Sequence, residues 1–246
     1  MMKAFAVTDV GQKRKINQDS VFVSTEPVGN LPNLFIVADG MGGHNAGDFA
    51  SRYAINAVRE AIEVSPEANP VKLISEAIRL ANEGILREAE AHEGMQGMGT
   101  TIVVTTILGN YVYTANVGDS RLYLYDGELR QVTRDHSLVE EMVRLGELSE
   151  EQAKNHPDRH IITRALGAAE SVNPDFFDFR LHPENKLLMC SDGLTNMVDD
   201  DEIRQVMEQP ISAEEMAGTL VGTANDNGGM DNIAVIIIEP DADEEE

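Results

Sequence analysis

The sequence predicts an α+β domain in which antiparallel β-sheets are covered by helices on their outer faces. Segments with strand-like patterns follow one another in runs, whereas the segments with helical patterns are gathered in two blocks. Strands and helices segregated in this way are typical of layered α+β folds rather than of alternating βαβ units. The chain has no internal repeat and no linker, so we expect a single domain over residues 1–240, followed by a disordered acidic tail at 241–246.

The N-terminal half is expected to contain three strands, at Lys3–Thr8, Ser20–Ser24 and Asn33–Ala38. The third strand is almost continuously apolar, which is typical of a strand buried on both faces. Apolar residues then recur at helical spacing in two segments, Asp48–Glu63 and Val71–His92. Asn69 and Pro70 give the second of these helices a capping side chain and a first-turn proline.

The remaining strands are expected at Thr100–Leu108, Tyr111–Val117, Arg121–Tyr125, Glu128–Val132, Asp175–Leu181, Lys186–Cys190 and Asn232–Ile238. Turn residues such as Asp126-Gly127 join the first four of them and indicate β-hairpins. The segment from Ser137 to His160 has a helical but polar pattern and a capping box at Ser149, so we expect a surface excursion there. A second capping box, at Ser212, predicts a helix that ends at about Ala224.

Composition excludes several functions. The chain has 246 residues, of which 43 are acidic and 19 basic, giving a net charge of −24. This charge disfavours binding to nucleic acid or to an anionic membrane surface. Cys190 is the single cysteine, so neither an intramolecular disulfide nor a cysteine-based zinc site is available. No apolar run approaches the roughly 18–20 residues that span a bilayer, and the N-terminus lacks a signal-peptide layout. We therefore expect a cytoplasmic protein.

Carboxylates stand at the ends of several apolar strands, at Asp19, Asp39, Asp119, Asp192 and Asp231. A carboxylate beside an apolar strand costs free energy unless it is solvated, paired or bound to a cation. Oxygen ligands of this kind suit Mg²⁺ or Mn²⁺ better than Zn²⁺. Two such ions about 4 Å apart are a recurring device for the hydrolysis of phosphate esters. The pattern therefore predicts a two-metal centre.

Six motifs that occur in this order carry a family resemblance: RKINQD at 14–19, DGMGGH at 39–44, GTT at 99–101, VGDSR at 117–121, SDGL at 191–194 and GMDNI at 229–233. The set resembles the metal-dependent protein phosphatases, the type 2C serine/threonine phosphatases, in their compact bacterial form. The resemblance extends from about Lys3 to Ile238. It implies a four-layer α-β-β-α sandwich in which two antiparallel sheets lie between pairs of helices. It also implies a flap at about 145–161 beside the active site.

The resemblance implies metal ligands residue by residue. Asp39 is expected to bridge two Mn²⁺ or Mg²⁺ ions, and the Gly40 carbonyl to bind one of them. Asp192 and Asp231 are expected to bind the first ion. Asp119, together with Asp192, resembles the pair that holds a third ion in bacterial relatives.

Further residues are implied to act on the water and on the phosphate. Asp19 is expected to orient metal-bound water, and Arg14 to hold the phosphate through its two parallel donors. A water that bridges the metals is expected to attack phosphorus in line, without a phosphoenzyme. Eukaryotic members have a histidine where this chain has Met41. His44 is therefore a candidate general acid, with a metal-bound water, or a structural role for His44, as alternatives.

The function that the resemblance implies is hydrolysis of phosphoserine and phosphothreonine in proteins, opposite a bacterial serine/threonine protein kinase. We expect the protein to act as a monomer. Two alternatives stay open, a phosphatase for small phosphate esters and a pseudophosphatase that binds phosphoproteins without turnover. All the expected metal carboxylates are present, which favours an enzyme. The acidic composition suggests the hypothesis that basic substrate segments are preferred.

Overall fold

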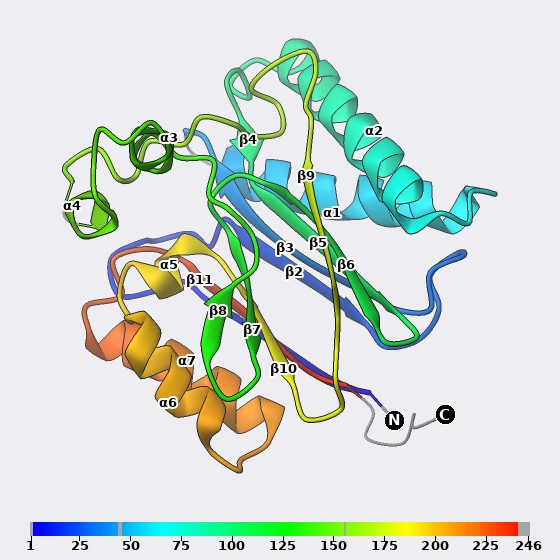
Figure 1. The fold of residues 1–246 in the computed structure, drawn as a ribbon. Coiled ribbons are helices and arrows are strands. Elements are labelled where there is room, and N and C mark those ends of the chain that lie inside the picture. Colours follow the sequence, from blue (N-terminus) through cyan, green and yellow to red (C-terminus); the bar gives the residue numbers. More distant parts are fainter. Residues whose placement is uncertain (1, 44–45, 155, 241–246) are drawn as a thin grey trace.

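The computed structural model describes residues 2–43, 46–154 and 156–240, and its strands form two antiparallel sheets (Figure 1). The strands are β1 (Lys3–Asp9), β2 (Asp19–Ser24), β3 (Leu34–Met41), β4 (Gly99–Thr100), β5 (Ile102–Leu108), β6 (Tyr111–Val117), β7 (Arg121–Tyr125), β8 (Leu129–Gln131), β9 (Asp175–Arg180), β10 (Lys186–Cys190) and β11 (Ile233–Glu239). One sheet has the order β1-β11-β10-β7-β8. The other has the order β2-β3-β5-β6-β9, with β4 paired to β3.

Helices cover the outer faces of both sheets. The helices of the described residues are α1 (Ala46–Val64), α2 (Pro70–Ala91), α3 (Leu138–Arg144), α4 (Glu150–Lys154), α5 (Asp192–Thr195), α6 (Asp200–Glu208) and α7 (Ala213–Asp226). The pair α1 and α2 lies on the sheet that contains β3, and the pair α6 and α7 lies on the sheet that contains β11 (Figure 1). This arrangement confirms the expected four-layer sandwich.

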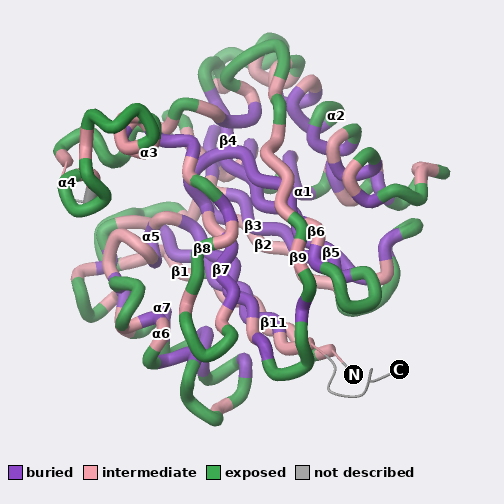
Figure 2. Tube along the Cα trace, viewed as in Figure 1, coloured by how far each residue is buried: buried purple, intermediate pink, exposed green. Residues whose placement is uncertain are grey.

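Alternation along the central strands builds the three hydrophobic cores between these layers. In β3, Ile36 packs toward α1 and α2, whereas Val37 packs toward the other sheet. In β11, Val235 packs toward α6 and α7, whereas Ile236 packs between the sheets. Because successive side chains in a strand point to opposite faces, a strand buried on both faces must be apolar at nearly every position. Figure 2 shows this burial along the strands and exposure on the outer helix faces.

The predicted surface excursion lies between β8 and β9, beside the sandwich, and contains α3 and α4 (Figure 1). The expected capping box is present, since the Ser149 N–H donates to Gln152 Oε1 and the Gln152 N–H donates to Ser149 Oγ. The cap at Asn69 is also present, because its side chain accepts from the Lys72 N–H at 3.1 Å. Among the described residues, no helix has the length and apolar character needed to cross a bilayer. The expected tail, 241–246, lies outside those residues.

Two helices were not predicted. The first, α5, is a single turn directly after β10. The second, α6, begins with a capping box in which Asp199 and Glu202 hold each other's backbone N–H groups. A capping box also identified the helix after Ser212. The helix α6 was missed because it is short and carries three acidic residues in its first turn, which leaves few apolar residues to show helical spacing.

Candidate metal centre

Asp19 and Asp39 lie side by side on neighbouring strands of one sheet. Asp19 begins β2 and is the register partner of Asp39 in β3. The peptide of Asp39 is held by the GTT motif. Its N–H donates to Thr101 Oγ1 at 3.0 Å, and its carbonyl accepts from the Thr101 N–H and the Thr100 hydroxyl, each at 2.9 Å. The GTT motif therefore fixes the backbone that carries one expected metal ligand.

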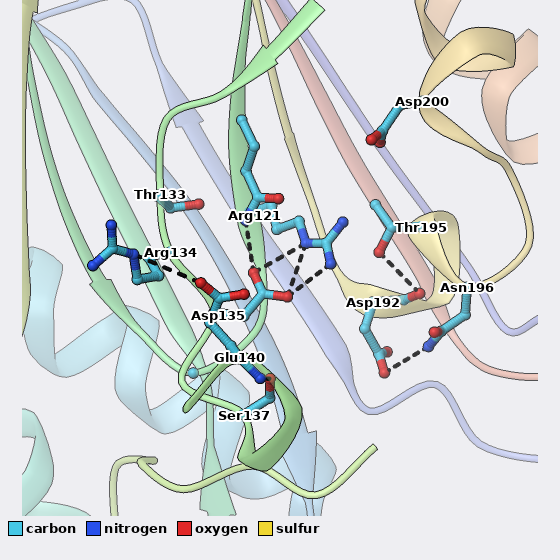
Figure 3. Close-up of polar contacts among 12 residues, drawn as sticks. Arg121, Thr133, Arg134, Asp135, Ser137, Glu140, Asp192, Thr195, Asn196 and Asp200 are labelled. Atoms are coloured by element: carbon cyan, nitrogen blue, oxygen red, sulfur yellow. Dashed lines mark hydrogen bonds and ion pairs between the residues drawn. The ribbon is translucent and has the colours of Figure 1, made fainter. Parts of the chain in front are cut away.

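Asp192 and Asp231 come from the other sheet. Asp192 begins α5, with Ser191 alone between it and β10, and Asp231 is separated by Asn232 from the start of β11, the neighbouring strand. The Asn196 Nδ2 donates to Asp192 Oδ2 at 2.9 Å, within the same short helix (Figure 3). A side chain at Gly193 would place its Cβ only 1.9 Å from the Asn232 carbonyl oxygen. The glycine in SDGL thus lets α5 pack directly against the turn that carries Asp231.

Ser191 connects the two sheets at this centre. Its hydroxyl donates to Asp19 Oδ2 at 2.6 Å and accepts from the Ala234 N–H at 2.9 Å. Asp19 belongs to β2 of one sheet and Ala234 to β11 of the other. The side chain of Ser191 is fully buried. Its hydroxyl therefore links the Asp19 carboxylate of one sheet to the backbone of the other, a role that the sequence did not predict.

Asp119 lies in the turn between β6 and β7, next to Gly118, whose φ of +108° favours glycine. The Gly118 N–H donates to His136 Nδ1 at 3.0 Å. The residue before that histidine, Asp135, accepts two hydrogen bonds from the Arg121 Nε and one from its Nη2 (Figure 3). The turn that carries Asp119 is thus tied to the segment that leads into α3.

Arg14 reaches the centre from the loop between β1 and β2. Its Nη2 donates to Asp231 Oδ2 at 2.7 Å. The loop is held by Asn232, whose Oδ1 accepts from the Gln18 N–H at 2.8 Å and whose Nδ2 donates to the Ile16 carbonyl at 3.0 Å. Asn232 is buried. Asn232 directly follows Asp231 in the GMDNI motif, but no pattern in the sequence reports its contact with the distant loop that carries Arg14.

The electrostatics of the centre are unfavourable for several ionised carboxylates at once. Burial, with the charges of Asp192 and Asp231, raises the pKa of Asp19 to about 7. Burial and the charge of Asp192 raise the pKa of Asp119 to about 8. Burial and the neighbouring carboxylates, with Asp19 first among them, hold the pKa of Asp39 well above its usual value. Asp19 Oδ1 is buried without a hydrogen-bond partner.

This donor set fits a divalent cation, because a cation would offset the repulsion and give the unpaired oxygen a ligand or an ordered water. Over residues 2–43, 46–154 and 156–240, no three Asp, Glu, His or Cys side chains already stand in a metal-holding arrangement. The carboxylates instead contact protein donors, such as Ser191, Asn196 and Arg14. His44, the candidate general acid, lies outside the described residues.

Comparison with known proteins supports this interpretation. The family described as Protein phosphatase 2C matches residues 11–227. The chain is 41% identical over 241 residues to the serine/threonine phosphatase stp of Listeria monocytogenes, covering 95% of this chain and 94% of that protein. The crystal structure of the Mycobacterium tuberculosis serine/threonine phosphatase PstP/Ppp has a TM-score of 0.89 at 34% identity, covering 98% of this chain and 99% of that one.

A further solved structure contains metal ions. The catalytic domain of the serine/threonine protein phosphatase PstP in complex with two manganese ions has a TM-score of 0.85 at 33% identity, with 97% of each chain covered. The chain belongs to the protein phosphatase 2C family. This confirms the resemblance inferred from the six motifs, together with the fold that it implied.

Proposed function

We propose that the carboxylate centre hydrolyses phosphoserine and phosphothreonine in proteins with two Mn²⁺ or Mg²⁺ ions. Family membership makes the chain a metal-dependent serine/threonine phosphatase. The observation that carries the proposal for this site is the meeting of carboxylates from two sheets, with raised pKa values at Asp19, Asp39 and Asp119. Such a charge surplus is offset by divalent cations and has no other compensation of equal size among the described residues.

In this proposal Asp39, Asp192, Asp231 and the carbonyl of Gly40 hold the two core ions, and Asp119 with Asp192 holds a third. When bound, the ions supply a water of lowered pKa and offset charge on the phosphoryl oxygens. Gly40 suits a carbonyl ligand because a Cβ there would lie 2.0 Å from the Gly47 carbonyl oxygen. Only glycine allows the backbone of β3 to pass so close to α1.

The chain's own side chains position the reactants. Arg14 is held beside Asp231, where its remaining N–H groups can donate to phosphoryl oxygens. Asp19 uses Oδ2 for Ser191, which leaves the buried Oδ1 to accept a hydrogen bond from the attacking water and orient it. Ser191 is unsuited to act as a nucleophile because it is fully buried and its hydroxyl oxygen accepts from the Ala234 N–H. For the proton that the leaving alkoxide takes up, His44 and a metal-bound water stay open as alternative donors.

The proposal has further parts that concern organisation and partners. Residues 1–240 form one catalytic domain, and the flap at about 145–161 borders the site. The position of Arg159 and His160 supports the flap, since both line a cavity that also contacts Asp231. The phosphoproteins are supplied by a bacterial serine/threonine protein kinase. The enzyme acts as a monomer in the cytoplasm.

Hydrolysis of a phosphothreonine peptide and of para-nitrophenyl phosphate, each with Mn²⁺ and with EDTA, tests the proposal. We expect Mn²⁺-dependent turnover that is lost in Asp192→Asn and in Asp39→Asn. The matched control is Asp201→Asn, an exposed carboxylate in α6, which should retain turnover. Calorimetric titration with Mn²⁺ should show weakened binding in the first two variants. A folded wild type without turnover under any metal would favour the pseudophosphatase, and preference for the small ester would favour the other alternative.

A further inference from the structure

A cavity of about 150 Å³ lies directly beside the candidate metal centre. Its lining comes from three parts of the chain: Arg159, His160, Gly193, Asn196, Met197, Met230 and Asp231. Asp231 belongs both to this cavity and to the carboxylate centre. A phosphorylated residue bound at the centre would therefore have the cavity next to it.

Two walls of the cavity are held rigidly. The wall from α5 is pressed against the Asn232 carbonyl at Gly193, and the Met197 carbonyl accepts from Asn227 Nδ2 at 2.8 Å. The wall from the turn before β11 is fixed at Gly229, whose carbonyl accepts from two backbone N–H groups of the Arg14 loop at 2.7 and 3.2 Å. These contacts keep the cavity open next to the centre rather than allowing the turn to collapse into it.

Two methionines supply the apolar part of the lining, beside the polar side chains of Arg159, His160, Asn196 and Asp231. Met230 is 55% exposed although it stands on a fixed turn beside the centre, and Met197, which also lines the cavity, is partly buried. Thioether side chains are apolar, polarizable and adaptable, so they suit contact with another flexible apolar side chain. The volume corresponds to roughly five water molecules. This is enough room for a leucine or methionine side chain.

We propose that this cavity is a substrate subsite for a leucine-sized apolar side chain, one or two residues from the phosphorylated residue of the phosphoprotein. The inference rests on the proposed function and adds a sequence preference to it. An extended peptide advances about 3.3–3.6 Å per residue, so a neighbour at this separation is the one that can reach an adjacent cavity. We call the cavity the flanking subsite.

Phosphothreonine peptides that differ only in one flanking position, occupied by Leu, Gly, Lys or Asp, test this subsite. We expect kcat/KM for the best Leu peptide to exceed that for its Gly counterpart by about tenfold, from burial of the apolar side chain. In Met230→Ser and in Met197→Ser this ratio should fall toward one. Leu80→Ser is the control, since Leu80 is an exposed apolar residue of α2 outside the site, and it should keep the wild-type ratio.

Equal kcat/KM for Leu and Gly peptides at every flanking position would overturn the flanking subsite. So would a preference for Asp that disappears in Arg159→Gln, because a cationic wall would then select the substrate. Fluorescence anisotropy measures how tightly the same peptides bind to the wild type in EDTA, where no hydrolysis is expected. Tighter binding of the Leu peptide there, with no hydrolysis under any metal, would retain the subsite and overturn the proposed function alone.

Discussion

Asp19 and Asp39 are register partners on adjacent antiparallel strands, so two carboxylates stand on the same face of one sheet. Like charges in directly opposed positions destabilise a sheet, and burial adds to the cost. The raised pKa values of both carboxyl groups express this cost. The pair therefore destabilises the protein in a way that depends on pH and on bound cations.

The stability of the protein in EDTA should fall as pH rises from 7 to 8. Asp19 and Asp119 have folded-state pKa values of about 7 and about 8, above the ordinary value of 3.8. A group whose pKa is raised by folding stabilises the folded state at low pH, and this contribution is lost as pH rises through the folded pKa. His136, whose pKa is lowered by burial from the ordinary value of 6.5, opposes this decline slightly near pH 7, because some of it is still protonated in the unfolded state. Thermal unfolding at several pH values measures the effect.

Saturating Mn²⁺ should remove most of the decline in melting temperature between pH 7 and pH 8. In EDTA, the Asp19→Asn variant should show a smaller decline than the wild type. A melting temperature in EDTA that rises or stays constant from pH 7 to pH 8 would contradict the prediction.

Gly193→Ala should impair both stability and metal binding. Its Cβ would overlap the Asn232 carbonyl oxygen, so α5 would have to move away from β11 and carry Asp192 away from Asp231. Overpacking of this kind costs about 1–3 kcal/mol in free energy of unfolding. Gly218→Ala is the matched control, because its Cβ meets open space in the middle of α7. It should stabilise the protein by about 0.5–1 kcal/mol. Urea unfolding and Mn²⁺ calorimetry report the two effects, and unchanged Mn²⁺ affinity in Gly193→Ala would refute the argument.

Asn232→Ala should raise KM for phosphopeptides by releasing the loop that carries Arg14. The variant loses the side-chain contacts to the Gln18 N–H and the Ile16 carbonyl. Asn30→Ala is a matched control, since Asn30 also donates to two backbone carbonyls but lies away from the centre, and it should leave KM unchanged. In an Arg14→Ala background, Asn232→Ala should add little to KM, because both changes remove the same interaction. Independent, additive effects would show that Asn232 acts by another route.

His136→Ala should destabilise the turn at Asp119. The substitution leaves the Gly118 N–H buried without its acceptor, which costs about 1–3 kcal/mol. His136→Asn should recover part of this loss, because its Oδ1 lies as far along the side chain as the histidine Nδ1. Urea unfolding of the three proteins provides the comparison. If the asparagine variant is no more stable than the alanine variant, the hydrogen bond to Gly118 is not the cause.

Local patterns predicted most strands because each is defined by its own residues. The apolar run ending at Ala38 and the turn at Gly109 gave correct strand positions. The helix α6 was missed although Asp199 and Glu202 form a capping box, because its apolar face spans barely two turns. Short helices depend on packing against their neighbours more than on their own propensity.

The candidate site could be predicted only in part. The carboxylates at strand ends were visible as a pattern, but their assignment to roles came from the family resemblance. The contacts that join them were not visible. Arg14 and Asp231 are 217 positions apart, and Ser191 and Asp19 are 172 positions apart. No local periodicity reports a contact between such distant residues. The first contact arises when β1 pairs with β11, and the second arises when the two sheets pack face to face.

The packing of the two sheets determines how the enzyme loses activity when it is destabilised. Asp39 is carried by one sheet, whereas Asp192 and Asp231 are carried by segments next to strands of the other. The active centre is therefore built from both halves of the sandwich. The distances between its carboxylates depend on how the two sheets are aligned. A small slip of one half against the other would disperse the carboxylates while every strand kept its hydrogen bonds. Heating or mild denaturant should accordingly abolish turnover before circular dichroism registers any loss of secondary structure.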